Sequence, residues 1–197
     1  VIGMALTICA AYPLSIKGLK GRTFISFFLM FTMYFSAGLI PEYLLLGDLN
    51  LINTMWVLVL PLAFSPYNML IMKSFLSSTI PDSLYEAAKL DGANHFQILT
   101  KVVLPLSKPI IIYTILISFI SPWCDYIFVS YILSGVPDTG MYTVSLGMFR
   151  WLEREMIQQY FTTFCAAAVI VATPITGLFM WLQKYYVEGV TGGAVKG

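Results

Sequence analysis

Long uncharged stretches alternate with short charged segments along the chain. Residues 1–16, 23–41 and 49–72 carry no charge, and residues 109–137 and 156–187 carry one each. A helix needs about 20 apolar residues to cross roughly 30 Å of hydrocarbon. The pattern therefore predicts four complete membrane spans, preceded by the last part of another. The expected spans are residues 1–16 (partial), 23–41, 51–73, 106–134 and 157–184.

The composition favours lipid as the solvent. Of 197 residues, 58% are hydrophobic and 11% are charged, whereas a soluble domain averages about 25% charged residues. Such a chain lacks the polar groups to cover its own surface, which argues against a soluble enzyme, a disordered segment, a nucleic-acid binder and a small disulfide-framed domain. We expect an all-α, polytopic bundle of membrane helices that forms a single domain over residues 1–197.

The basic residues orient the predicted spans. If the first connection is cytoplasmic, nine of the eleven Lys and Arg residues lie inside, and only Arg150 and Arg154 lie outside. Short cytoplasmic connections carry an excess of Lys and Arg. We therefore expect the third connection and the C-terminus on the cytoplasmic side.

The third connection is too long for a simple turn and carries its own helix signals. Ser83 and Glu86 have the spacing of a capping box, with Ser83 as the N-cap. A short helix from Leu84 to Leu90 would follow and end at Asp91, because Gly92 can adopt the left-handed conformation.

A second helix is expected directly after this turn. Asn94 and Gln97 form another capping box, and the helix would run to about Leu104 and stop or kink before Pro105. One face of this helix would carry Phe96, Leu99, Thr100 and Val103. Residues 77–105 are therefore predicted to be a folded helix–turn–helix loop that docks a partner.

The residues of this loop resemble a known family. Glu86–Ala88 reads EAA, Asp91–Ala93 reads DGA, and Val102–Pro105 reads VVLP. This pattern resembles the EAA loop of permease subunits in binding-protein-dependent ABC sugar importers. Further matches are the segments AYPLS (11–15), GLIPEY (38–43), LSKP (106–109) and GVTGGAVKG (189–197), the last similar to the end of the G-type subunits for maltose and maltodextrin.

The resemblance implies a type I ABC permease fold with six spans, of which about five are present. The missing part is expected upstream, and Gly197 is expected at or near the natural C-terminus. The implied partners are a second homologous permease, two ATPase subunits that carry ATP and Mg²⁺, an extracellular solute-binding protein and a sugar. The implied role is import of a maltodextrin-like oligosaccharide by alternating access across a bacterial cytoplasmic membrane. The chain itself would have no catalytic residue, cofactor or metal.

The resemblance also assigns residues that couple the permease to the ATPase. Small alanines allow close approach, and a glycine makes the sharp turn. Two interpretations of Glu86 stay open: it caps its own helix, or it also pairs with a basic group on the ATPase. The assigned coupling residues are Ser83, Glu86, Ala87, Ala88, Asp91, Gly92, Ala93, Phe96, Leu104 and Pro105.

Candidates for the solute path rest on weaker signals. Asp125 is an acid inside a predicted span, where it either lines the path or forms a hydrogen bond between helices. Trp123 and Tyr126 flank it and suit sugar rings, but they are also ordinary interface anchors. Cys124 replaces the Asn that the family often has at this position. Tyr67 and Asn68 are further candidates, beside prolines that would bend their span.

The remaining segments and the competing functions carry fewer signals. Residues 41–50 are expected to be an interfacial segment, and residues 142–160 either a surface lid or an external contact. His95 is the only histidine, which argues against a metal site. A polytopic enzyme would need more polar groups within the spans, and an ion-coupled transporter would need intramembrane acids and internal repeats. An amino-acid or peptide ABC permease is the nearest alternative.

Overall fold

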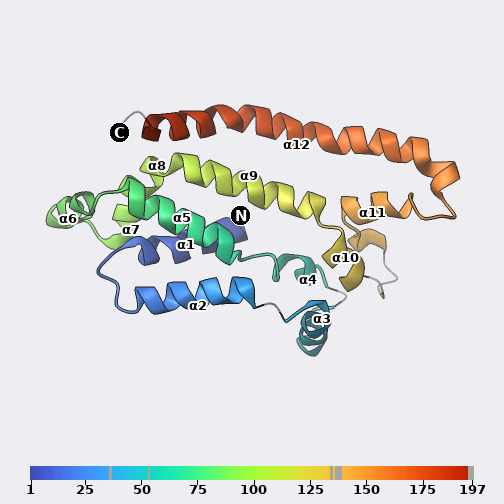
Figure 1. The fold of residues 1–197 in the computed structure, drawn as a ribbon, viewed down its shortest axis with the longest axis horizontal. Helices are drawn as coiled ribbons and strands as arrows, with labels where there is room; N and C mark the ends of the chain where they lie inside the picture. The colour runs from blue at the N-terminus through green and yellow to red at the C-terminus, as the bar shows by residue number, and fades with distance from the viewer. Residues whose placement is uncertain (36, 53, 134, 136–138, 195–197) are drawn as a thin grey trace. The chain divides into compact units, whose positions relative to one another are not determined.

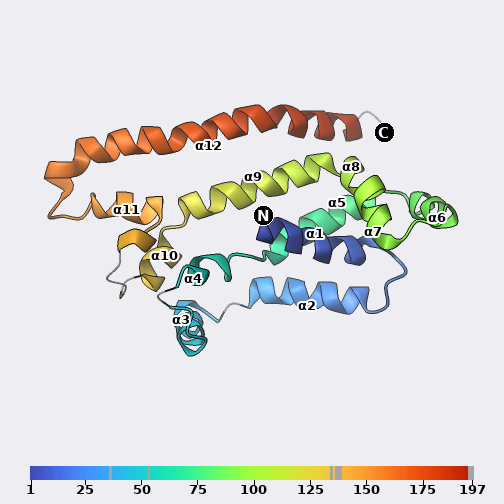
Figure 2. The same cartoon turned by 180° about the vertical axis from the view of Figure 1, so that it is seen from behind.

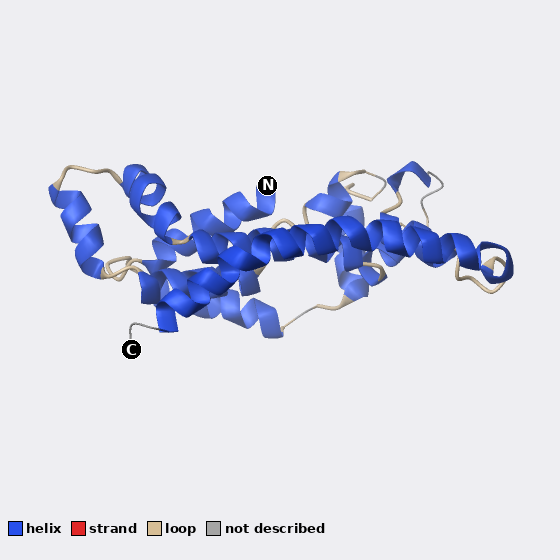
Figure 3. Cartoon of the chain, turned by 90° about the horizontal axis from the view of Figure 1, so that it is seen from above, coloured by secondary structure: helices blue, strands red, loops and turns tan. Residues whose placement is uncertain are grey.

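The computed structural model describes residues 1–35, 37–52, 54–133, 135 and 139–194, and these residues form helices joined by loops, with no strand among them (Figure 3). The main helices are α1 (Ile2–Ser15), α2 (Arg22–Tyr34), α3 (Leu39–Asp48), α4 (Trp56–Val59), α5 (Pro66–Thr79), α6 (Asp82–Leu90), α7 (His95–Ile98), α8 (Leu104–Leu106), α9 (Lys108–Cys124), α10 (Ile127–Ile132), α11 (Val144–Arg150) and α12 (Ile157–Ala194). The all-α prediction is confirmed.

The chain divides into two compact units. The first unit contains residues 1–36, 63–115 and 183–197, and the second contains residues 37–62 and 116–182. Each unit is therefore assembled from segments that are distant in the sequence.

In the first unit, α1 and α2 both lie against α5 (Figures 1 and 2). The core includes the side chains of Ala11 and Leu14 on α1 and of Met69 and Met72 on α5. The start of α5 is fixed locally, because the Ser65 hydroxyl accepts a hydrogen bond from the Asn68 amide and proline occupies the first turn. Burial of this apolar face holds α5 beside α1.

The second unit has a smaller core of its own. Buried side chains come from α3 (Leu46), α4 (Val57), α10 (Val129 and Ile132) and α11 (Leu146). Most of these helices are short, so their stability must come from packing rather than from helix propensity.

The helices differ from the predicted spans in their continuity. The segment Ile157–Gln183 of α12 is long and apolar enough to cross a membrane, in agreement with the predicted last span. Two helix pairs, α2 with α3 and residues 95–106 with α9, reach that length only if each pair is counted as one span. The predicted span 51–73 is divided between α4 and α5, and the predicted span 106–134 is interrupted between α9 and α10.

Candidate coupling element

Residues 80–107 form a folded element between α5 and α9 in the first unit, here called the coupling element. It contains α6, a glycine turn, α7, a π-helical turn at Leu99–Val103, and α8. Figure 1 shows α6 beyond the C-terminal end of α5, with α7 and α8 closer to that end. The predicted helix–turn–helix loop is therefore present, but its details differ from the prediction at three points.

The first difference is the start of α6. The sequence pattern predicts Ser83 as the N-cap, but α6 begins at Asp82, and Pro81 occupies the N-cap position without a side-chain cap. Proline fixes its own φ and is compatible with this boundary. Asp82 then places a negative charge in the first turn, where the helix dipole favours it. The predicted Ser83–Glu86 capping box is therefore wrong.

The turn between the two helices follows the prediction. Asp91 is the C-cap of α6, and Gly92 has a φ of 78°, in the left-handed region. At the next helix start, the Asn94 side chain accepts a hydrogen bond from the Gln97 amide (2.8 Å), and the Gln97 side chain accepts one from the Asn94 amide (2.9 Å). Two backbone amides at the start of α7, which have no partner within the helix, are thus hydrogen-bonded.

The second difference lies in the winding after α7. The chain forms a π turn at Leu99–Val103 and remains helical through Leu106, so Pro105 does not end the helix. In a regular helix, proline lacks an amide donor and clashes with the carbonyl four residues earlier; here a π turn directly precedes the segment that contains Pro105. The helix ends at Ser107, and α9 leaves at 84° to the preceding segment.

The third difference follows from this π turn. A regular helix would place Phe96 and Val103 on one face, but Phe96 is 72% exposed and Val103 is 1% exposed. Ile98 is buried instead, five residues before Val103. A spacing of five matches a π turn, so the widened turn puts Ile98 and Val103 on the buried side.

The inner face of the coupling element packs on the core of the first unit. Tyr85 of α6, together with Ile98 and Val103, belongs to the same buried cluster as Tyr12 of α1 and Leu76 of α5. Burial raises the pKa of the Tyr85 hydroxyl above its usual value; the Ser15 hydroxyl acts in the opposite direction, and the Asp82 carboxylate raises the pKa. Tyr85 therefore stays neutral near pH 7, as a buried phenol should.

The exposed face of the element carries large apolar side chains among polar ones. Leu84, Ala87 and Leu90 recur every three residues, so they share one side of α6. Leu84 is 40% exposed and Leu90 is 89% exposed. With the exposed Phe96, they form what we call the apolar ridge. Several large apolar side chains left in solvent by a folded element are typical of an interaction surface.

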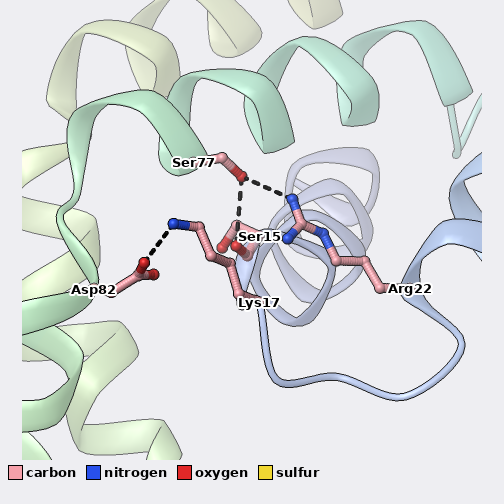
Figure 4. A network of polar contacts seen from close by, with 5 residues as sticks. All are labelled: Ser15, Lys17, Arg22, Ser77 and Asp82. Atoms are coloured by element: carbon pink, nitrogen blue, oxygen red, sulfur yellow. Dashed lines mark hydrogen bonds and ion pairs between the residues drawn. The ribbon is translucent and has the colours of Figure 1, made fainter.

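Polar contacts tie the start of α6 to the end of α1. The Lys17 ammonium pairs with the Asp82 carboxylate (2.5 Å), and both side chains are exposed (Figure 4). The Ser77 hydroxyl of α5 donates to the Ser15 carbonyl (3.4 Å) and accepts from Arg22 (3.5 Å). The connections at this end of α1, α2 and α5 are therefore held by side-chain bonds as well as by packing.

The structure brings the ten predicted coupling residues into this one element. Their environments differ: most are exposed, while Ala88, Ala93 and Leu104 are partly buried. Glu86 is exposed on α6, so it remains accessible to a partner.

Two further residues matter that the sequence pattern does not single out. Leu90 carries the most exposed large side chain of the apolar ridge, and the helical spacing from Leu84 could have revealed it. Tyr12, in the AYPLS segment, belongs to the buried cluster on which the coupling element packs, and no local sequence signal marks this contact.

The solute-path candidates are divided between the two units. Tyr67 and Asn68 lie on α5 in the first unit; Tyr67 is 54% exposed, and Asn68 is buried. Within the described part of the chain, the Asn68 side-chain oxygen has no hydrogen-bond partner. An unsatisfied buried amide is unusual, so this oxygen is the strongest polar feature among the candidates on α5.

The other three candidates surround the break between α9 and α10 in the second unit. The Asp125 carboxylate accepts a hydrogen bond from the Phe128 amide (3.3 Å), and the Asp125 carbonyl accepts one from the Ser145 hydroxyl (2.8 Å). The rings of Trp123 and Tyr126 contact Phe119 and Phe149, with centroids 5.6 Å and 4.1 Å apart. These contacts give all three residues a structural role, and contact with a solute stays a prediction.

The class of this helical protein follows from its likeness to a known family. A model of the family of binding-protein-dependent transport system inner membrane components matches residues 3–192. The chain belongs to this family.

Relatives of this chain transport sugars. The chain is 34% identical to the polygalacturonan/rhamnogalacturonan transport system permease protein YtcP of Bacillus subtilis, over 100% of this chain and 72% of YtcP. It is 36% identical to the galactooligosaccharides transport system permease protein GanQ of the same organism, over 95% of this chain and 66% of GanQ.

The solved structure is a chain from a bacterial ABC transporter involved in the import of the acidic polysaccharide alginate. Its TM-score is 0.77 at 29% identity, and the match covers 94% of this chain and 69% of that one. Together these findings confirm a permease subunit of a sugar ABC importer, a membrane protein whose relatives are transport subunits rather than enzymes.

Proposed function

We propose that this chain moves an oligosaccharide across the cytoplasmic membrane by alternating access, and that ATP-driven movement reaches it through the coupling element. The observation that carries the proposal is the division of this element into two faces. Its inner face is buried against α1 and α5, while its outer face exposes Leu84, Leu90 and Phe96. One face thus belongs to the permease, and the other is available to an ATPase subunit.

The geometry of the coupling element suits transmission of force. Its two ends continue along the chain into α5 and α9, so a push on α6 acts directly on two helices. Its hydrogen-bonded capping box and its glycine turn keep it compact. A ligand or a partner can shift a conformational equilibrium only by binding the two states differently, and a rigid docking element allows such a difference to be transmitted.

The excess of basic residues places this element on the cytoplasmic side in our proposal. The ATPase subunits, with their ATP and Mg²⁺, would contact it there, and the solute-binding protein would act on the opposite side. We further propose a second, homologous permease subunit. Within Ile157–Gln183 of α12, only 6% of the most apolar stretch is buried by the rest of this chain. The remainder of that stretch is available for contact with lipid and with such a subunit.

The proposed solute is a maltodextrin-like oligosaccharide. Oligosaccharide and polysaccharide names among the relatives support the class, and the ending GVTGGAVKG supports the maltodextrin type. Sugar-stimulated ATP hydrolysis by the reconstituted importer, measured with maltodextrins, galactooligosaccharides and acidic oligosaccharides in turn, tests this assignment. Stimulation by the other sugars and not by maltodextrins would contradict it.

The docking role is tested by charging the apolar ridge. Replacing Leu90 and Phe96 together by Glu puts two charges into the proposed contact, where burying an unpaired charge costs several kcal/mol. We expect transport by the importer in proteoliposomes to fall by about a hundredfold or more. The matched control is Leu19→Glu, an exposed leucine in the α1–α2 connection outside the coupling element. Full transport by the double variant would exclude docking through this ridge.

A further inference from the structure

We propose that Tyr12 is the positioning residue that makes α1 move with the coupling element. This inference rests on the proposed function and adds a third helix to the moving part. The coupling element is joined through the chain to α5 and α9, but α1 ends at Ser15, more than sixty positions before α6. Movement can reach α1 indirectly through its packing on α5, but a direct link from the element to α1 requires noncovalent contacts.

Tyr12 contacts both halves of the coupling element. Its hydroxyl donates to the His95 carbonyl of α7 (3.2 Å) and lies 3.4 Å from the Nδ1 atom of that residue. Its ring lies 6.5 Å from the Tyr85 ring of α6 and 6.5 Å from the His95 ring, the latter edge-on. One side chain of α1 thus holds α6 and α7 at the same time.

The Tyr12 side of this contact is buried, whereas His95 is exposed. Tyr12 is 6% exposed and Tyr85 is 8% exposed, and both belong to the core of the first unit. Loss of this hydrogen bond would leave the Tyr12 hydroxyl unsatisfied, which is costly for a buried polar group. Any displacement of α7 relative to α1 breaks the Tyr12–His95 bond, so the two elements should move together.

A second contact assists at the surface. The Lys17–Asp82 pair links the end of α1 to the start of α6, but its side chains are 72% and 49% exposed. Exposed ion pairs are weak. We therefore assign the attachment mainly to Tyr12 and only a minor share to this pair.

The test compares graded variants of Tyr12 in the complete importer. Tyr12→Phe keeps the ring and removes only the hydrogen bond, so the sugar moved per ATP hydrolysed should fall about two- to tenfold. Tyr12→Ala should lower this ratio further. His95→Ala should have a smaller effect than Tyr12→Phe, because the main-chain acceptor remains. Tyr34→Phe, at an exposed position on α2, is the matched control and should leave the ratio unchanged.

A spectroscopic measurement separates attachment from general damage. The first pair of spin labels is placed at Cys9 on α1 and at Lys101→Cys in the π turn, in a chain with Cys124 and Cys165 replaced by Ser. The distance distribution of this pair should be narrow in the parent and should broaden in the Tyr12→Ala variant. A second pair, Lys89→Cys with Lys101→Cys in a chain with all three native cysteines replaced by Ser, lies within the coupling element and should stay narrow.

The outcomes divide clearly. An unchanged sugar-to-ATP ratio in assembled Tyr12 variants overturns the proposal, as does a lower ratio with an unchanged distance distribution for the first label pair. If Tyr12→Ala does not assemble, Tyr12→Phe decides. If the apolar-ridge variant loses transport but the Tyr12 variants keep the parent ratio of sugar moved to ATP hydrolysed, only the attachment of α1 through Tyr12 is refuted. When neither set has an effect, the docking proposal fails as well.

Discussion

The coupling element and the break between α9 and α10 both interrupt apolar helices with polar residues, yet they differ in how they use their acidic side chains. In the coupling element, the hydrogen-bonding side chains of Asn94 and Gln97 serve the local fold, and the acidic side chain of Glu86 stays exposed. At the break, the one acid, Asp125, bonds the Phe128 amide of α10.

This difference affects how an isolated acid in an apolar segment should be interpreted. From the sequence, Asp125 is a strong single candidate for function, because acids inside spans are rare. The structure shows a local use for it, since a helix that starts anew needs an acceptor for its first amides. The apolar ridge, in contrast, has no evident use within the described residues of its own unit, and it therefore points to a partner.

The largest expected effect among these comparisons concerns the glycine turn. Gly92→Val forces a β-branched residue into a φ of 78°, which costs about 2 kcal/mol or more. No side-chain clash contributes, because the space around Gly92 is open. We expect the coupling element to lose its compact form, and transport-coupled ATP hydrolysis in proteoliposomes to fall by about tenfold or more.

The matched control for Gly92 is Gly18→Val. Gly18 is also surrounded by open space, but its φ lies outside the left-handed region. We expect the Gly18→Val importer to keep its transport-coupled ATP hydrolysis unchanged. Undiminished coupling in a normally assembled Gly92→Val importer would show that the sharp turn is not needed.

A smaller effect is expected at the helix break. Asp125→Ala removes the acceptor for the Phe128 amide and should destabilise the protein by about 1 kcal/mol, whereas Asp125→Asn keeps an acceptor and should be nearly neutral. The midpoint of thermal unfolding and the KM for sugar uptake are measured for both. A KM that changes strongly in Asp125→Asn, at unchanged stability, would restore the solute-path interpretation.

The smallest effect is expected at the surface of the coupling element. Lys17→Ala should reduce stability by no more than about 1 kcal/mol, because its pair with Asp82 is exposed. Exchanging the two residues, with Lys17→Asp and Asp82→Lys, should recover part of the loss in low salt and little in high salt. The exchange also removes the favourable charge from the first turn of α6. A loss of several kcal/mol would mean that this pair, rather than Tyr12, carries the attachment.

Features that depend on neighbouring residues can be predicted well. The Asn94–Gln97 capping box and the left-handed Gly92 need only residues a few positions apart, so the sequence identifies them. The predicted cap at Ser83 is wrong although it also rests on neighbouring residues. Ser83 and Glu86 fit the capping-box pattern, but the helix begins one residue earlier, at Asp82 after Pro81. Two local signals compete, and spacing alone cannot rank them.

Features that depend on packing could not be predicted. The π turn puts Ile98 and Val103 on the buried side and Phe96 in solvent, contrary to the regular helical face. The break at Asp125 interrupts a stretch that looks continuous by hydrophobicity, whereas the division between α4 and α5 falls at the prolines that were expected to bend that span. The length of an uncharged stretch indicates whether it can cross a lipid bilayer. It does not indicate where the helix breaks.

The sequence by itself determined the class of protein, the membrane setting and the location of the coupling element, because composition, charge spacing and the EAA pattern are written along the chain. Only the tertiary structure decided which faces of that element are buried and that Tyr12 joins it to α1. Tyr12 and His95 are 83 positions apart. A contact over that separation exists only because α1, α5 and the coupling element bury their apolar faces against one another.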